Sequence, residues 1–334
     1  MLNVFITGIS GFVGSHVVDK LLAREDIKIF GLILPKDKNL PFLKNPKIKL
    51  IEGDILSKES VYNFLNQNVE GNRIVIHIAG MISVYKKNDP LAYNINVNGT
   101  INMVDVSIEM GIERFIYISS VDSLNRKEPG MLVKEQDSYN KDEVIGVYSK
   151  SKAHANQYIL DKCKECGFPG IILCPSAILG PDDPFMAPIN QSLDKYYHKK
   201  LPAIVKGGYD LVDVRDVAEG IVLAMDKGNI GQSYLLTGTS ISLVDLFKLC
   251  GQILKRKPVR IIIPYFVIYI ISPFIELFAK MRHKRPLFTS FSMSCLKQNP
   301  NYSHQKASDE LGYIHRDLKG SLVDTFAWIE NKSK

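Results

Sequence analysis

The sequence predicts an α/β protein with a doubly wound parallel sheet, followed by a smaller, mixed α/β C-terminal substrate lobe. Short runs of β-branched residues alternate with amphipathic stretches through the first half of the chain. A glycine-rich turn follows the first run, and the alternation ends after about residue 175. Strands and helices that alternate at this spacing indicate βαβ units, whose ligands bind at the carboxyl ends of the strands.

The elements follow from this alternation. Strands are expected at residues 4–7, 27–34, 47–51, 73–78, 114–119 and 170–174. Helices are expected to begin near Phe12, Ser57, Asp89 and Val147. Turn clusters then precede a helix at 216–227, a strand at 233–236 and a helix at 242–254. We therefore expect a dinucleotide-binding domain at 1–175, to which 209–237 returns, and a substrate lobe at 176–208 and 238–334.

Composition excludes several classes of protein. The 334 residues are 46% hydrophobic and carry a net charge of +7, which excludes a disordered chain and is too small for a nucleic-acid-binding surface. Cys163 and Cys166 form one C-x-x-C without a second ligand pair, so no metal site is expected. Met1 leads directly into an apolar strand without a basic region, which predicts no signal peptide and a cytoplasmic protein.

The glycine-rich turn predicts a phosphate site. Gly8 permits a tight turn, Gly11 lets the backbone approach a pyrophosphate, and Gly14 lets the following helix pack closely on the sheet. A plain strand-to-helix turn would not need three glycines at this spacing. The candidate nucleotide-binding residues of the turn are Thr7, Gly8, Ser10, Gly11, Phe12, Val13 and Gly14. The sheet is therefore predicted to be of the Rossmann type.

The G-x-x-G-x-x-G spacing resembles the extended short-chain dehydrogenase/reductase superfamily, which includes the NAD-dependent epimerase/dehydratase family. The segments Gly53-Asp54-Ile55, His77-Ile78-Ala79-Gly80 and Asn96-Val97-Asn98-Gly99-Thr100 resemble further motifs of that family. The resemblance implies that Asp54 and Ile55 contact the adenine, that Ala79 and Gly80 lie beside its ribose, and that Asn96 belongs to the nucleotide site. Taken singly, Asp54 also fits a helix cap and His77 a buried core histidine.

The candidate catalytic residues are Ser120, Tyr148 and Lys152. Tyr148 and Lys152 are four residues apart, which places them on one helix face, although an exposed polar helix turn has the same pattern. A nearby ammonium favours the phenolate, so the pair could exchange a proton at neutral pH. The resemblance implies that Lys152 also binds the nicotinamide ribose and that Ser120, with Ser119 as the alternative, holds the substrate oxygen.

Two downstream segments extend the resemblance. Residues 174–181 resemble the R-P-x-x-x-x-G-P segment that contacts the nicotinamide, which implies that Pro175 and Ser176 contact the cofactor, although Cys174 replaces the arginine. Residues 212–218 match a V-x-V-x-D-V-A helix start, in which Asp216 is interpreted as a structural cap.

The cofactor is predicted to be NADP rather than NAD. No carboxylate stands at the tip of the second strand, where NAD enzymes usually bind the ribose 2′-hydroxyl, and Lys36 and Lys38 follow at once. Lys36 is the candidate contact for the 2′-phosphate. Asp37 could reverse this preference, and the two lysines also fit solvated loop charges.

The substrate is predicted to be a ketone or aldehyde, or the corresponding secondary alcohol, of a comparatively apolar molecule. Residues 301–313 resemble the dihydroflavonol-4-reductase-like and 3β-hydroxysteroid-dehydrogenase-like branch. A sugar-nucleotide epimerase or dehydratase is the first alternative, but Val121 replaces one dehydratase acid and Tyr209-Asp210 replaces the arginine of epimerases. A non-catalytic nucleotide-binding regulator is the second.

An apolar stretch at 261–279 precedes four basic residues at 280–285. An apolar helix followed by basic residues is typical of peripheral membrane contact, so the segment from Ile261 to Arg285 is a candidate for it. One alternative is a wall of the substrate lobe. The other is a membrane-spanning helix, which the prolines within the stretch disfavour. The family resemblance also implies a homodimer.

Overall fold

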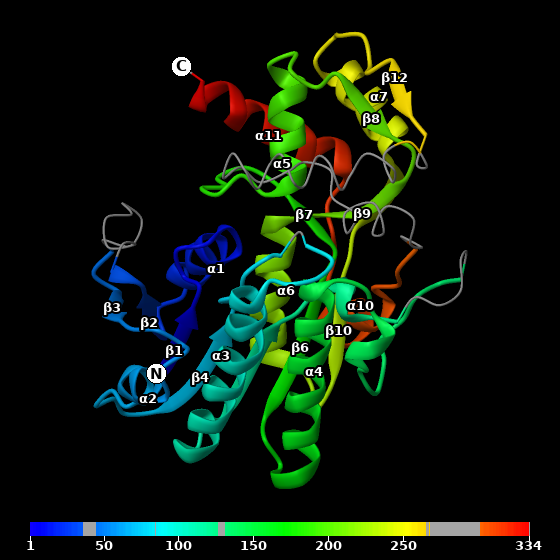
Figure 1. Cartoon of the computed structure of the whole chain (residues 1–334). Coiled ribbons are helices and arrows are strands. Elements are labelled where there is room, and N and C mark those ends of the chain that lie inside the picture. Colours follow the sequence, from blue (N-terminus) through cyan, green and yellow to red (C-terminus); the bar gives the residue numbers. More distant parts are fainter. Residues whose placement is uncertain (36–44, 84, 126–130, 265–266, 268–300, 334) are drawn as a thin grey trace.

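The larger lobe is built on a parallel sheet of seven strands. A computed structural model describes the chain except for residues 36–44, 84, 126–130, 265–266, 268–300 and 334 (Figure 1). The strand order is β10-β6-β5-β4-β1-β2-β3. The strands are β1 (Leu2–Thr7), β2 (Ile27–Ile33), β3 (Ile48–Glu52), β4 (Asn72–His77), β5 (Arg114–Ile118), β6 (Gly170–Pro175) and β10 (Ser233–Leu236). The predicted doubly wound fold is confirmed.

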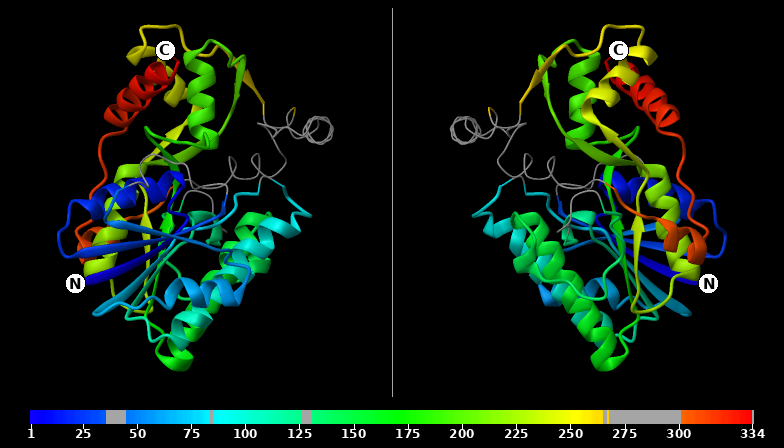
Figure 2. Two further views of the ribbon diagram at one scale, coloured as in Figure 1. Left: turned by 90° about the vertical axis from the view of Figure 1, so that its left-hand side faces the viewer. Right: turned by 90° about the vertical axis from the view of Figure 1, so that its right-hand side faces the viewer.

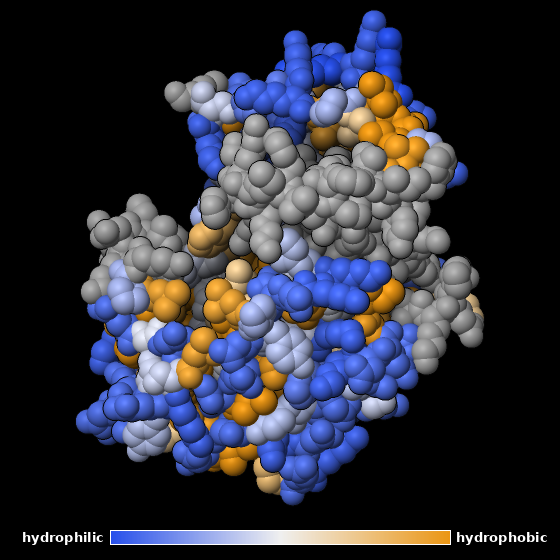
Figure 3. Space-filling view, in the orientation of Figure 1, coloured by the Kyte–Doolittle hydropathy of each residue, from blue (hydrophilic) through white to orange (hydrophobic). Residues whose placement is uncertain are grey.

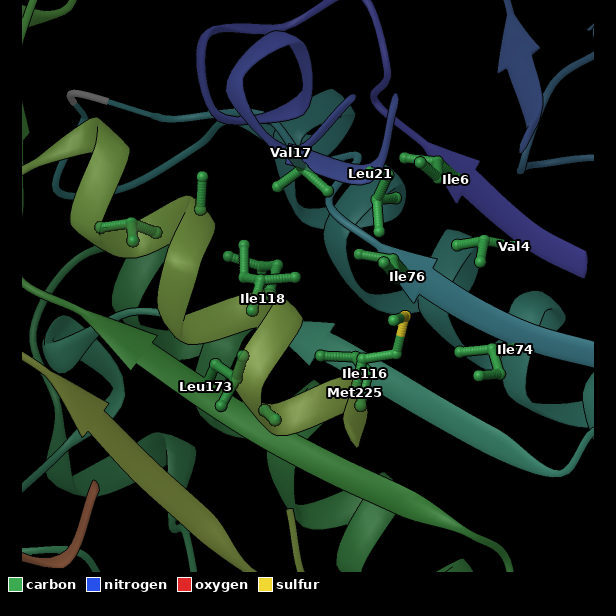
Figure 4. Close-up of a cluster of buried hydrophobic side chains, with 14 of the residues drawn as sticks. Val4, Ile6, Val17, Leu21, Ile74, Ile76, Ile116, Ile118, Leu173 and Met225 are labelled. Carbon is green, nitrogen blue, oxygen red and sulfur yellow. The ribbon is translucent and has the colours of Figure 1, made fainter. Parts of the chain in front are cut away.

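Helices cover both faces of this sheet (Figure 2). One face carries α1 (Phe12–Leu22), α6 (Val214–Lys227) and α10 (Gln305–Leu311), and the other carries α2 (Lys58–Leu65), α3 (Pro90–Glu109) and α4 (Val147–Cys166). Because neighbouring strand residues point to opposite faces, Val4 and Ile6 pack toward α1 whereas Phe5 packs toward α2. Figure 4 shows the first of these cores, with Val17 of α1 and Met225 of α6 over the sheet.

The smaller lobe lies beyond the carboxyl ends of the large sheet (Figure 1). Its three-stranded sheet has the order β11-β9-β7, and a separate pair joins β8 and β12. The elements are β7 (Ala177–Leu179), α5 (Pro188–Tyr197), β8 (Ala203–Val205), β9 (Gly208–Asp213), β11 (Thr239–Ser242), α7 (Leu243–Ile253), β12 (Ile261–Ile263) and α11 (Leu318–Lys332). Leu193, Leu246 and Phe326 form part of its own core.

The chain passes between the lobes several times, and the division differs from the expected one at two places. β9 pairs with β7 and β11 in the small sheet, so only the later part of 209–237 returns to the large lobe. α10 packs on α6 and β10, and Leu311 and Tyr313 join the core of the large lobe. These side chains cover β10, which is the edge strand of the sheet.

The apolar segment Ile261 to Arg285 is only partly described. β12 covers its first residues, and most of the remainder lies outside the described residues. Among the helices that the structure describes, none combines the length and the apolar character required to cross a bilayer.

Candidate active site

The glycine-rich turn lies where the strand order reverses. A Cβ on Gly8, which has φ +70°, would lie 2.7 Å from the backbone nitrogen of Ala79, so the chain after β1 touches the chain after β4. The two strands are neighbours from which the sheet winds in opposite directions, and this is where doubly wound sheets bind nucleotides. A Cβ on Gly14 would lie 2.2 Å from the Gly8 carbonyl oxygen. Both positions therefore require glycine.

The start of α1 fits a pyrophosphate. Gly11 is its N-cap and provides no side-chain hydrogen bond, and the first turn of the helix carries no acidic residue. The backbone N–H of Gly11 donates to the Gly8 carbonyl over 3.0 Å. Within the described residues a Cβ on Gly11 would meet only that same carbonyl oxygen, at 3.1 Å, so this side of the turn remains open. An open helix N-terminus without a carboxylate suits an anion.

The other candidates in the turn contribute in different ways. The Thr7 side chain is fully buried, and its hydroxyl accepts from the Ala79 backbone N–H over 3.2 Å, so Thr7 supports the turn from behind. Ser10 is also buried. Phe12 packs edge-on against His16, and Val13 lies against the core of the large lobe.

The segment after β3 holds Asp54 at the surface. An Asp54 carboxylate oxygen accepts from the backbone N–H of Leu56 over 2.9 Å, and the side chain is exposed. The N-cap of α2 is Ser57, so the alternative interpretation of Asp54 as a helix cap is wrong. Ile55 is buried against Gly99 of α3, where a Cβ would lie 2.6 Å from it.

Asn96 joins the loop after β4 to α4. Its side-chain amide donates to the carbonyl of Met81 and to the hydroxyl of Ser151, each over 2.9 Å, and it accepts from the Met81 N–H. Ala79 and Gly80 lie in this fixed loop. A Cβ on Gly80 would lie 3.3 Å from the Lys152 ammonium nitrogen, so the loop passes directly over that ammonium group.

Lys152 is buried beneath Gly80, with 3% of its surface exposed. Its ammonium group donates to the Ile118 carbonyl over 2.7 Å and to the Tyr117 hydroxyl over 3.2 Å. Burial lowers its pKa to about 7. The carboxyl end of β5 therefore holds this side chain from α4 in place.

Tyr148 and Ser120 meet at the same edge. Burial raises the pKa of Tyr148, the Asp122 carboxylate raises it further, and a hydrogen bond with the Ser120 hydroxyl acts in the opposite direction. The expected stabilisation of the phenolate by the lysine is not observed, because the Lys152 ammonium bonds to Ile118 and Tyr117 instead. The raised pKa favours the protonated phenol of Tyr148.

The structure distinguishes the two candidate serines. Ser120 caps a short 3-10 turn, Val121–Ser123, and its hydroxyl lies at Tyr148. Ser119 faces the interior, where its hydroxyl lies 3.5 Å from that of Ser123 and beside the buried Cys174. The site geometry therefore favours Ser120. Cys174, in the place of the family's arginine, packs in the core between the sheet and α4.

Further candidates lie at or near the sheet edge. Pro175 ends β6, and the buried Ser176 follows it. The interpretation of Asp216 as a cap is wrong, because Asp213 caps α6 and Asp216 binds Arg316. Lys36 lies outside the described residues.

The sequence allowed His77 to be a buried core histidine, which the structure confirms, but it did not predict the role of Tyr117 behind Lys152. His77 is fully buried and has hydroxyl partners on both ring nitrogens, Thr7 at 2.6 Å and Thr100 at 3.1 Å. Tyr117 stacks on His77 with ring centroids 5.6 Å apart. Polar residues inside apolar strand runs were the available signal, but contacts between distant elements decide their partners.

Comparisons with known proteins identify the family of the chain. Residues 4–236 match the NAD dependent epimerase/dehydratase family. The chain is 28% identical to a putative dihydroflavonol 4-reductase of Synechocystis, with 98% of this chain and 94% of that protein covered. It is 25% identical to the sterol-4-alpha-carboxylate 3-dehydrogenase ERG26 of Saccharomyces cerevisiae, with 98% of each covered.

A solved structure supports the same relationship. The crystal structure of gox2253 superposes with a TM-score of 0.84 at 31% identity and covers 98% of both chains. Reductases and dehydrogenases are thus named among the relatives, and the family uses a nicotinamide nucleotide. The chain is an NAD(P)-dependent enzyme and belongs to the NAD dependent epimerase/dehydratase family, the extended type of short-chain dehydrogenase/reductase.

Proposed function

We propose that the enzyme interconverts a carbonyl group and a secondary alcohol on a comparatively apolar substrate. The observation that carries this proposal is the meeting of Ser120, protonated Tyr148 and buried Lys152 at the edge of the sheet beside the glycine-rich turn. The bound nucleotide would supply or accept a hydride. In the reducing direction, the Tyr148 hydroxyl donates a proton to the substrate oxygen, which Ser120 holds by a hydrogen bond.

Two features oppose a sugar-nucleotide substrate. Epimerases usually place an arginine for the diphosphate where this chain has Tyr209-Asp210, and Asp210 is a buried carboxylate that accepts from the Gly238 N–H over 2.8 Å. The first dehydratase acid is replaced by Val121, which packs in the core. The names of the two relatives, a dihydroflavonol reductase and a sterol dehydrogenase, support an apolar substrate instead.

Turnover of a carbonyl panel tests the proposal. Oxidation of the reduced nucleotide is followed spectrophotometrically with flavonoid, steroid and aliphatic ketones, and Tyr148→Phe should lower the rate by about 10² or more. Nucleotide affinity should change little, because the phenol acts on the substrate. Tyr158→Phe on the same helix is the matched control, since its hydroxyl binds Asp105 on α3.

Two outcomes would contradict the proposal. A near-normal rate of reduction in Tyr148→Phe would show that Tyr148 is not the proton donor. Conversion of UDP- or dTDP-sugars without net consumption of reduced nucleotide would favour the epimerase or dehydratase alternative, and nucleotide binding without any turnover would favour a regulator.

We propose NADP as the preferred nucleotide, on the sequence alone. Lys36 and Lys38 follow β2 without a carboxylate at the strand tip. In steady-state comparison, kcat/KM should be higher with NADPH than with NADH, and the preference should shrink in Lys36→Gln and Lys38→Gln. A wild-type preference for NADH would reject this assignment and leave the carbonyl chemistry untouched.

Membrane contact and a homodimer stay predictions. Figure 3 shows an apolar patch at the upper right, in the area where Figure 1 places β12. Ile261 and Ile262 of this strand are 59% and 44% exposed, and the basic residues at 280–285 follow farther along the chain. Flotation with anionic liposomes tests the contact, which should weaken as salt rises and when Arg282, Lys284 and Arg285 are neutralised. Absence of binding at low salt would reject it.

A further inference from the structure

The contacts of Lys152 leave one of its donors uncommitted. An ammonium group has three N–H donors, and the described residues engage two of them, at the Ile118 carbonyl and the Tyr117 hydroxyl. The Tyr117 ring also lies under the charge, with its centroid 4.6 Å from the nitrogen. In the described part of the chain, no carboxylate forms an ion pair with this buried lysine. Its charge therefore depends on neutral partners, of which Tyr117 supplies both an oxygen and a π face.

Tyr117 belongs to a buried hydrogen-bond chain that reaches the glycine-rich turn. Its hydroxyl pairs with that of Thr100, which lies 3.1 Å from His77 Nε2. The other ring nitrogen, Nδ1, lies 2.6 Å from the Thr7 hydroxyl, and Thr7 precedes Gly8 directly. Tyr117, Thr100, His77 and Thr7 are all fully buried.

The protons in this chain have one consistent arrangement. The Thr100 hydroxyl donates to the Asn96 carbonyl over 2.7 Å, so it can only accept from its other partners. His77 must then carry its proton on Nε2 and accept the Thr7 proton on Nδ1. Burial and the nearby Lys152 lower the pKa of His77 to about 3, which keeps the ring neutral. Tyr117 donates to Thr100, so its lone pairs are free to accept from Lys152.

We propose that Tyr117 is a positioning residue for Lys152. Its hydroxyl and ring hold the ammonium so that the third N–H faces the nucleotide beneath Gly80, and the chain through Thr100 and His77 ties this position to the glycine-rich turn. The inference rests on the proposed function, because it concerns the same lysine. It differs from a packing role, since the hydroxyl and not only the ring is required.

Tyr117→Phe tests the inference, because it keeps the ring and removes only the hydroxyl. A hydrogen bond to a charged group is lost, so the Kd of the reduced nucleotide, measured by calorimetry, should rise about tenfold. The basic limb of the pH profile of kcat should move to lower pH, because the ammonium form of Lys152 loses an acceptor. The other titratable groups around this nitrogen, His77, Cys174 and Tyr148, are unchanged.

Tyr139→Phe is the matched control. Tyr139 is another buried tyrosine of the same core cluster, and among the described residues its hydroxyl contacts neither Lys152 nor Tyr148. This variant should keep the wild-type Kd and pH limb. If Tyr117→Phe also keeps both, Tyr117 has only a packing role and the inference is overturned.

A double-mutant cycle gives a second readout. In a Lys152→Met background, Tyr117→Phe should not change the Kd further, whereas an undiminished effect would show that Tyr117 acts elsewhere and would overturn the inference. Should Tyr117→Phe not fold, Thr100→Val takes its place in the cycle. The calorimetric readout needs no turnover, so a failed carbonyl assay would reject the proposed function without deciding this question.

Discussion

At the scale of single residues, burial shifts the pKa values of Tyr148 and Lys152 in opposite directions. The phenol is kept protonated, and the pKa of the amine is lowered until it titrates near neutrality. The spacing of four predicted one helix face, but it could not predict that Tyr117 and the Ile118 carbonyl take the ammonium group. Those partners come from a strand some 35 residues earlier, and only the folded sheet brings them to α4.

The buried lysine predicts a pH-dependent stability. Its pKa is near 7 in the folded chain and 10.5 when exposed, so between these pH values the unfolded chain binds more protons. The free energy of unfolding contributed by Lys152 therefore rises with pH across this window, by up to about 1.4 kcal/mol per pH unit. Denaturant titrations should show that the free energy of unfolding of Lys152→Met exceeds that of wild type at pH 7. The difference should be smaller at pH 9.5.

Lys164→Met, on the exposed end of the same helix, is the control and should follow wild type at both pH values. An equal advantage of Lys152→Met at both pH values would contradict the assigned titration.

At the scale of elements, the six apolar runs of the first half all formed strands, because continuous β-branched residues between turn signals suit a sheet covered on both faces. The strands β7 and β11 have only three and four residues, and β9 mixes apolar residues with a glycine and two aspartates, so none of them shows such a pattern. Caps were also uncertain from sequence alone, since Asp213 rather than Asp216 begins α6. Asp216 instead binds Arg316, which lies 100 residues away along the chain.

Two glycines in helices predict opposite effects of alanine. Gly14→Ala places a Cβ 2.2 Å from the Gly8 carbonyl oxygen, so the turn must open and both stability and nucleotide affinity should fall. Gly320 in α11 is exposed and has no atom within 4 Å of its would-be Cβ, so Gly320→Ala should stabilise the protein by about 0.5–1 kcal/mol. Thermal unfolding with and without nucleotide measures both, and unchanged nucleotide affinity in Gly14→Ala would refute the first.

At the scale of the whole molecule, Arg316 links the helix layer of the large lobe to α11 of the small one. It binds the buried Asp216 through its backbone N–H at 2.8 Å and its side-chain Nε at 2.7 Å. Arg316→Ala leaves this carboxylate half satisfied, so the free energy of unfolding should fall by about 1–3 kcal/mol. Lys58→Ala, which breaks a pair whose side chains are each 52% exposed, should leave the free energy of unfolding nearly unchanged, because solvent screens this ion pair. Equal losses in urea titrations would contradict this difference.

The order of the strands also bears on how the protein is made. β10 lies beside β6 in the sheet, but β7, α5, β8, β9 and α6 are synthesised between them. A nascent chain that has emerged only as far as Pro175 presents β6 as a bare edge with unpaired backbone groups, a template for association with other chains. Much of the small lobe is therefore synthesised before β10, the strand that completes the large sheet. For the same reason, recombination cannot transplant the small lobe into another member of the family through a single crossover.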